Sequence, residues 1–213
     1  MTQPVLILGT RTLAVEVLDL ISDMPGYEVT GFVENMNREL AGTELEGRPI
    51  YWIDDVPKFA GTHLGVCALS TTHRRAYVEQ AAALGLRLGT FIHPTARVSS
   101  RARLGDGSFI SAMAVIATHT TLGRCVFVNR GALIGHHTSI GDYCTIQPGA
   151  NVAGTVTVGN DTYVGMGAVV LERHTIGQGC VIAAGAVVTH DLPDHVQVMG
   201  VPARIVKSDI EAK

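Results

Sequence analysis

Aliphatic residues recur at every sixth position through the second half of the chain. Starting at Ile92 and stepping by six, seventeen consecutive positions carry Leu, Ile or Val, and the series ends at Val188. If about a third of positions were aliphatic, chance would give such a series on the order of once in 10⁸. A glycine follows the aliphatic residue at an 18-residue spacing, at positions 105, 123, 141, 159 and 177. The second half is therefore a repeat with two nested periods.

The two periods predict a stack of triangular coils. Six residues suffice for one short strand and one corner, and three such sides close a coil of 18 residues. The aliphatic residue of each side is expected to point inward, and the glycines permit a sharp turn or a close approach between coils. An all-β sandwich with fortuitous spacing is the alternative, but sandwich strands do not keep one period from residue 92 to residue 188.

The first half of the chain has a different pattern, in which apolar runs alternate with helical periodicity. Three short runs predict strands: Val5–Leu8, Val29–Val33 and Gly65–Leu69. Apolar residues three or four apart predict a helix after the first run, at Leu13, Val17, Leu18 and Ile21. A second helix follows the third run and is expected to stop near Gly85. This alternation predicts a small parallel sheet covered by helices, and hence two domains, residues 1–90 and 91–213.

Composition and charge narrow the class of protein. Hydrophobic residues make up 46% of the chain and charged residues 16%, which excludes disorder as the main state. The net charge of −3 provides no basic field for nucleic acid. With no apolar stretch of 18 residues and no basic segment at the N-terminus, we expect neither a membrane span nor a signal peptide. Four widely spaced cysteines without a CxxC pair indicate reduced thiols in a cytoplasmic protein, and no metal site is expected.

The repeat resembles that of the left-handed parallel β-helix acyltransferases. Met199-Gly200-Val201-Pro202-Ala203-Arg204 looks like the segment that closes many of these enzymes near the coenzyme A site. The whole chain is similar to one subgroup, the nucleotide-sugar N-acetyltransferases together with the sialic acid O-acetyltransferases. Three segments carry this likeness: Leu6-Ile7-Leu8-Gly9 leading into a helix, Gly31-Phe32-Val33-Glu34-Asn35, and Phe91-Ile92-His93-Pro94-Thr95-Ala96. The resemblance implies a small Rossmann-like N-terminal domain followed by a left-handed parallel β-helix.

In this subgroup a glycine-rich turn after the first strand contacts the sugar nucleotide. Here only Gly9 remains of that turn, and Arg11 and Thr12 are available as donors to a phosphate instead. Glu34, with Asn35 beside it, ends the second strand, where a carboxylate can accept from a ribose or a base, although a solvated charge is the alternative. Ser70, Thr71 and Thr72 end the third strand and are expected to form the opposite wall.

The 18-residue period also places candidate catalytic residues in register. Thr118, His136, Gly154 and Glu172 form one column, and His119, His137, Thr155 and Arg173 form the next. Gly135-His136-His137 resembles the catalytic element of the subgroup, in which an acidic residue follows the histidine. The resemblance implies that His136 is the general base and that the N–H of Gly154 donates to the thioester oxygen.

Several alternatives stay open at this point. His137 cannot supply the negative charge of the usual acidic neighbour, so another carboxylate, with Asp142 as one candidate, or a backbone carbonyl would orient His136. Asn129 is a possible substrate contact or a structural corner residue. His119 and His137 are equally well read as structural.

For coenzyme A, the resemblance implies a groove between neighbouring β-helices. Four small residues would let the coenzyme A arm approach: Gly165, Ala183, Ala184 and Gly185. Two cationic side chains near the C-terminus, Arg204 and Lys207, would bind its phosphates.

The resemblance implies an acetyl-CoA-dependent N-acetyltransferase that acts on a UDP-, GDP- or dTDP-linked amino sugar by direct transfer. The first alternative is O-acetylation of sialic acid or another sugar hydroxyl, and the second is an inactive structural β-helix. A groove at the edge of one prism needs a second prism to close it, and the resemblance implies a homotrimer. We expect neither nucleic acid nor a membrane as a partner.

Overall fold

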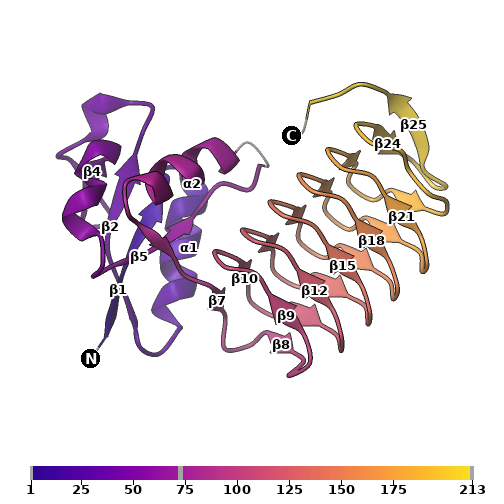
Figure 1. The fold of residues 1–213 in the computed structure, drawn as a ribbon, viewed down its shortest axis with the longest axis horizontal. Coiled ribbons are helices and arrows are strands. Elements are labelled where there is room, and N and C mark those ends of the chain that lie inside the picture. The colour runs from indigo at the N-terminus through magenta and orange to yellow at the C-terminus, as the bar shows by residue number, and fades with distance from the viewer. Residues whose placement is uncertain (1, 72–73, 212–213) are drawn as a thin grey trace. The chain divides into compact units, whose positions relative to one another are not determined.

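The chain divides after Pro94, a few residues beyond the predicted boundary at residue 90, into units of residues 1–94 and 95–213. The computed structural model describes residues 2–71 and 74–211. Figure 1 shows the two architectures, a sheet with helices in indigo to magenta and a stack of coils in magenta to yellow.

Unit 1 is a twisted sheet with helices. Its strands are β1 (Gln3–Leu8), β2 (Tyr27–Glu34), β3 (Glu44–Leu45), β4 (Arg48–Trp52), β5 (Leu64–Cys67) and β6 (Arg87–Leu88), and β7 (Phe91–Ile92) follows them. Its helices are α1 (Thr12–Ser22) and α2 (Arg74–Ala83), with 3₁₀ helices η1 (Arg38–Leu40) and η2 (Ile53–Phe59). The three predicted strands and both predicted helices are present, whereas the pattern missed β3, β4 and β6.

The sheet order is β3-β4-β2-β1-β5-β6, and every neighbouring pair is parallel except β3 and β4. The chain moves from β1 outward through β2, then returns to β5 on the other side of β1. Right-handed crossovers in opposite directions place α1 and α2 on opposite faces of the sheet. A crevice is therefore expected where the order reverses, at the carboxyl ends of β1 and β5.

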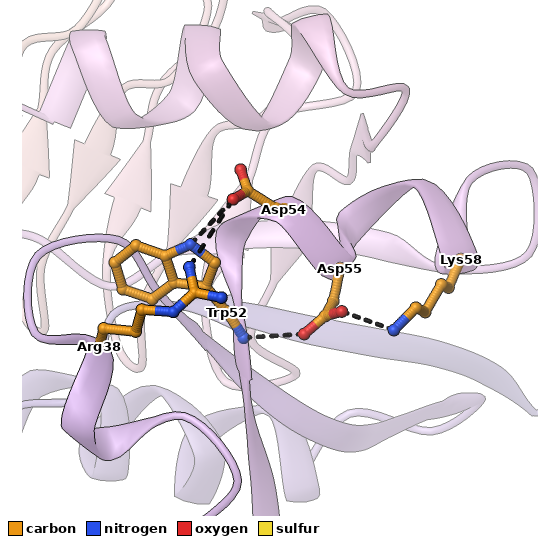
Figure 2. A network of polar contacts seen from close by, with 5 residues as sticks. All are labelled: Arg38, Trp52, Asp54, Asp55 and Lys58. Atoms are coloured by element: carbon orange, nitrogen blue, oxygen red, sulfur yellow. Dashed lines mark hydrogen bonds and ion pairs between the residues drawn. The ribbon is translucent and has the colours of Figure 1, made fainter.

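A polar network braces the segment between β2 and η2. The indole Nε1 of Trp52 donates to Asp54 at 3.1 Å, and the guanidinium of Arg38 lies 5.1 Å from the centre of the Trp52 ring (Figure 2). Asp55 accepts from the backbone N–H of Trp52 at 3.3 Å and pairs with Lys58 at 2.5 Å. The Lys58 ammonium lowers the pKa of Asp55. These contacts link η1 to the start of η2 and so support the loop that follows β2.

Unit 2 is a parallel β-helix of short strands. Its strands are β8 (Arg97–Val98), β9 (Arg103–Leu104), β10 (Phe109–Ile110), β11 (Val115–Ile116), β12 (Thr121–Leu122), β13 (Phe127–Val128), β14 (Leu133–Ile134), β15 (Ser139–Ile140), β16 (Thr145–Ile146), β17 (Asn151–Val152), β18 (Thr157–Val158), β19 (Tyr163–Val164), β20 (Val169–Val170), β21 (Thr175–Ile176), β22 (Val181–Ile182), β23 (Val187–Val188), β24 (Gln197–Met199) and β25 (Arg204–Lys207). Within the unit they form three sheets, β25-β24-β22-β19-β16-β13-β10, β23-β20-β17-β14-β11-β8 and β21-β18-β15-β12-β9.

The register between coils is 18 residues, as predicted. Ile116 pairs with Ile134, Ile134 with Val152, and Val152 with Val170. From Ile110 to Val188 every position of the six-residue series is at most 2% exposed. The inward ladder is thus the core of this unit.

The first three positions of the series depart from this prediction. Val98 and Leu104 are only partly buried against the core, and Ile92, which belongs to unit 1, is 42% exposed. The prediction of an inward, buried side chain was therefore wrong for Ile92, the first member of the series.

The glycines at the 18-residue spacing serve close approach rather than sharp turning. Gly105, Gly123 and Gly141 lack positive φ, but a Cβ on any of them would meet the next coil at 2.3–2.5 Å. Asp142 and Asn160 occupy that space beside Gly123 and Gly141, where their side chains accept from backbone N–H groups of the preceding coil. The glycines therefore allow a hydrogen-bonded corner to form.

Candidate active site

The reversal point of the sheet in unit 1 holds a cavity of about 510 Å³. It is lined by residues at or just after the carboxyl ends of β1, β2 and β5, including one residue each of α1 and η1, and by one residue of α2: Gly9, Thr10, Arg11, Leu13, Glu34, Asn35, Met36, Asn37, Leu40, Ala68, Leu69, Ser70, Thr71 and Tyr77. Six of the predicted contacts line this cavity, namely Gly9, Arg11, Glu34, Asn35, Ser70 and Thr71. Thr12 does not line it, and Thr72 lies outside the described residues.

Glu34 organises one wall of this cavity. Its Oε1 accepts from the backbone N–H groups of Asn35, Met36 and Asn37 at 3.1, 2.7 and 3.1 Å, and its Oε2 accepts from the hydroxyl of Thr10. Burial raises the pKa of Glu34, but the Thr10 hydroxyl and these N–H groups outweigh it, so the net pKa is lowered. These hydrogen bonds of the Glu34 carboxylate hold the loop that follows β2 in place.

Sequence reasoning missed the groups that hold this wall in place. Thr10 follows the end of β1, and Glu34 ends the neighbouring strand β2. A hydroxyl and a carboxylate at the ends of two neighbouring strands were the signal that could have revealed their contact. Tyr77 donates from α2 to the carbonyl of Val33, and the Asn35 amide donates to Gln80 of α2 at 3.0 Å. Both contacts join segments far apart in the chain, so no local pattern reveals them.

In unit 2 one corner brings His136 and Gly154 together. The N–H of Thr155 donates to the carbonyl of His136 at 2.8 Å, which sets the two coils in register. A Cβ added to Gly154 would lie 2.8 Å from both Cε1 and Nε2 of His136, so the exposed imidazole rests against the glycine. Among the described residues, no group accepts from the N–H of Gly154. This corner therefore presents an accessible imidazole beside a free backbone donor.

The neighbour of His136 is a second imidazole rather than a carboxylate. Nδ1 of His136 lies 3.1 Å from Nδ1 of His137, and the ring of His137 stacks on His119 one coil below, with centroids 4.9 Å apart. Asp142 stands at a different corner, where its carboxylate accepts from the N–H of Arg124 at 2.9 Å. The structure thus brings three histidines together and leaves Asp142 apart from them.

Asn129 is buried, with 4% of its surface exposed. Its oxygen accepts from the N–H of Arg130 at 2.8 Å, and its nitrogen donates to Gln147 at 3.4 Å. Both ends of the amide are therefore used within the coils, as expected of a corner residue.

The residues predicted for coenzyme A lie around the last coils. Ala184 and Gly185 are exposed, whereas Gly165 is buried and a Cβ there would meet backbone atoms of Ala184 and Ile182 at 2.6 and 2.7 Å. Gly165 is thus required by coil packing, and Ala183 on the next coil is partly buried. Arg204 and Lys207 are both exposed on β25, which pairs with β24.

In the described part of the chain, neither the cysteines nor a cluster of possible metal ligands forms a further candidate site. Cys67, Cys125, Cys144 and Cys180 are free and buried, and burial raises the pKa of the Cys180 thiol. In residues 2–71 and 74–211, no group of three or more His, Cys, Asp or Glu side chains is placed to hold a metal ion.

Comparison with known proteins identifies the fold. The model of the bacterial transferase hexapeptide family, with six repeats, matches residues 119–154 and 155–190. A histidine-to-alanine variant of GDP-perosamine N-acetyltransferase from Caulobacter crescentus, solved with CoA and GDP-perosamine, is 30% identical; the match covers 96% of this chain and 97% of that one, with a TM-score of 0.88. The chain belongs to the hexapeptide-repeat acetyltransferase family that includes the nucleotide-sugar N-acetyltransferases.

Two further solved structures are similar to this acetyltransferase along almost their whole length. The acetyltransferase domain of PglB from Neisseria gonorrhoeae, in complex with acetyl coenzyme A, is 29% identical, with 97% of this chain and 100% of that one covered and a TM-score of 0.88. WeeI from Acinetobacter baumannii is 26% identical, with 96% and 100% covered and a TM-score of 0.86. A search of curated proteins found no match. Two predictions are confirmed: a Rossmann-like unit followed in the sequence by a left-handed β-helix, and the acyltransferase class.

In the part of this acetyltransferase that the structure describes, no helix has both the length and the apolar character needed to cross a membrane.

The Glu34→Ala variant of this acetyltransferase is expected to lower the free energy of unfolding by about 1–3 kcal/mol, because three backbone N–H groups lose their acceptor. Since the folded-state pKa of Glu34 is lowered from 4.5, its stabilising effect is present above that pH and disappears as the pH falls through the lowered pKa. Urea titrations of both proteins, at neutral pH and in increasingly acidic buffers, measure the difference. A difference that is absent at neutral pH, or that grows towards acid, contradicts this role.

Proposed function

We propose that this protein is an acetyl-CoA-dependent N-acetyltransferase that acts on a nucleotide-linked amino sugar. The observation that carries the proposal is the exposed imidazole of His136 resting against Gly154, whose N–H has no acceptor among the described residues. The relatives support the substrate class, since one is a GDP-perosamine N-acetyltransferase bound to CoA and GDP-perosamine and another is bound to acetyl coenzyme A.

His136 is the general base of this reaction. If Nδ1–H of His136 donates to Nδ1 of His137, then Nε2 keeps its lone pair and stays on the side of Gly154. Nε2 then removes a proton from the amine of the sugar while the amine nitrogen attacks the carbonyl carbon of the thioester. The imidazolium that forms is oriented by the His137 ring, whose stacking on His119 restrains it.

The N–H of Gly154 stabilises the charge that develops in this step. As the C–N bond forms, the thioester oxygen becomes an oxyanion, and a donor fixed in the backbone can meet it without reorganisation. The C–S bond then breaks, the thiolate of CoA takes the proton held by His136, and the acetamide is released. No covalent acyl-enzyme is required, in keeping with four buried cysteines.

The two substrates are assigned to separate parts of the chain. The cavity in unit 1 takes the nucleotide, with the Arg11 side chain and the turn at Gly9 as donors to its phosphates. The exposed residues Ala184, Gly185, Arg204 and Lys207 take the coenzyme A arm and its phosphates.

We also propose that the working form is a cytoplasmic homotrimer. His136 and His137 are exposed in the single chain, and Leu133 on the strand leading into their corner is 41% exposed, as expected of a surface that a second chain covers. Light scattering should give a molecular mass three times that of one chain. A mass of one chain in an active preparation contradicts a site completed by a neighbour.

The acceptor class is tested by calorimetry with UDP-, GDP- and dTDP-linked amino sugars and with the free sugars. We expect one nucleotide-linked sugar to bind while its free sugar does not. Binding of free sugars without dependence on a nucleotide would instead favour the O-acetyltransferase.

A further inference from the structure

The first two coils of unit 2 carry a second cavity, open to solvent, that the proposed reaction does not use. Its volume is about 520 Å³, and its walls are Ser100, Arg101, Ala102, Arg103, His119 and Thr121. These residues come from the corner after β8, from β9, from the corner before β12 and from β12 itself.

The lining is cationic and rich in hydrogen-bond donors. Arg101 and Arg103 each present a guanidinium with five N–H donors, the hydroxyls of Ser100 and Thr121 add two more groups, and no acidic side chain lines the cavity. Within residues 2–71 and 74–211, neither guanidinium has an ion-pair partner. Two unpaired guanidinium groups at one cavity match a multidentate oxyanion such as a phosphate.

His119 has a backbone conformation that recurs at the corners of the coils. His119 has a φ of 57°, in the left-handed region that favours glycine, and so do His137, Thr155 and Arg173 above it. The neighbouring corner column has the same conformation but uses glycine from the second coil onward, at Gly131, Gly149, Gly167 and Gly185. The third corner column also carries side chains in this conformation, at Cys125, Tyr143 and Asp161, so the positive φ is a feature of the coil corners.

The contacts of the His119 ring link this cavity to the catalytic corner. The ring forms part of the cavity wall and stacks on His137, which hydrogen-bonds to His136. A ligand in this cavity is therefore separated from the base by two imidazole rings.

We infer that this cavity is a phosphate-binding subsite that holds a phosphate group of one of the two nucleotide substrates near the His119–His137 stack, in addition to the donors assigned to those phosphates above. The identity of the ligand rests on the proposed function, but the binding of an oxyanion does not. Both substrates carry phosphates, so kinetics has to distinguish them.

Binding is tested by calorimetry with inorganic pyrophosphate on the full chain. The Arg101→Gln/Arg103→Gln variant should lose one binding event or bind there at least about 10-fold more weakly, because each guanidinium makes charge-assisted hydrogen bonds. Arg97→Gln, an exposed arginine on β8 outside the cavity, is the matched control and should bind like the unmodified protein. Equal binding by the double variant and the control overturns the site.

Kinetics on the same variants identifies the ligand. We expect the double variant to raise KM about 10-fold or more for one substrate, either acetyl-CoA or the sugar nucleotide, with kcat and the other KM little changed. Two unchanged KM values alongside lost pyrophosphate binding overturn the assignment to a substrate. Pyrophosphate binding by a chain that transfers no acetyl group would leave the subsite intact and contradict the proposed function instead.

Discussion

Replacing His136 with alanine is expected to lower kcat by roughly 10²–10⁴-fold while leaving the fold intact. The side chain is exposed, and its hydrogen bond in the described chain is to His137, so its loss removes the base without opening a cavity in the core. Steady-state rates of CoA thiol release measure the effect, and circular dichroism with thermal melting confirms the fold.

His190→Ala is the matched control for this variant. His190 is half-buried outside the three-histidine cluster and contacts Thr189 through Nδ1 at 3.4 Å, so its loss should leave kcat nearly unchanged. Unchanged turnover in His136→Ala removes this residue from the mechanism. An equal loss in both variants would show that the effect is not specific to the corner.

The second large effect is expected at Gly154, and it separates catalysis from stability. In Gly154→Ala the new Cβ comes within 2.8 Å of the His136 ring, and the ring can move away because it is exposed. A displacement of about 1 Å at the base lowers kcat by about 10²-fold, with little change in unfolding free energy. Kinetics and chemical denaturation on the same preparation test both parts.

Gly165→Ala provides the opposite case. Its Cβ meets backbone atoms of Ala184 and Ile182, which cannot rotate out of the way, so we expect a loss of about 1–3 kcal/mol in stability. Neither glycine has a positive φ, so the two substitutions differ in what the new methyl group touches and not in backbone strain. An active, normally stable Gly154→Ala protein contradicts the placement of His136 against this glycine.

The coils could be predicted almost completely because one rule repeats. In-register parallel pairing places every eighteenth residue in one column, so the period alone determined that His136 and Gly154 share a corner. The rule fails at its first member, Ile92, because the period carries no information about where the stack ends. The glycine column was expected to allow either a sharp turn or a close approach, and the structure shows close approach. The Asp142 and Asn160 side chains that fill the space beside it were not anticipated.

Unit 1 shows where sequence reasoning stops. The runs at Val5 and Val29 predict strands, but β3 and β6 are two residues long and leave no periodic signal. Glu34 was expected to accept from a ribose or a base, with a solvated charge as the alternative, and it lines the cavity. The pattern did not show that its carboxylate also holds the loop through the three N–H groups that follow and the Thr10 hydroxyl. The contact between the two imidazoles could likewise not be predicted. The Nδ1–Nδ1 contact of His136 and His137 depends on side-chain rotamers, which the 18-residue register does not define.

The central claim is tested most directly by incubating the protein with acetyl-CoA and each of the UDP-, GDP- and dTDP-linked amino sugars. Free thiol is followed by colorimetry and the sugar product by mass spectrometry with fragmentation. We predict stoichiometric release of CoA with one nucleotide-linked sugar and an acetyl group on its amine nitrogen. Thiol release no faster than background hydrolysis across the whole panel, or acetylation on a hydroxyl oxygen alone, would contradict the account.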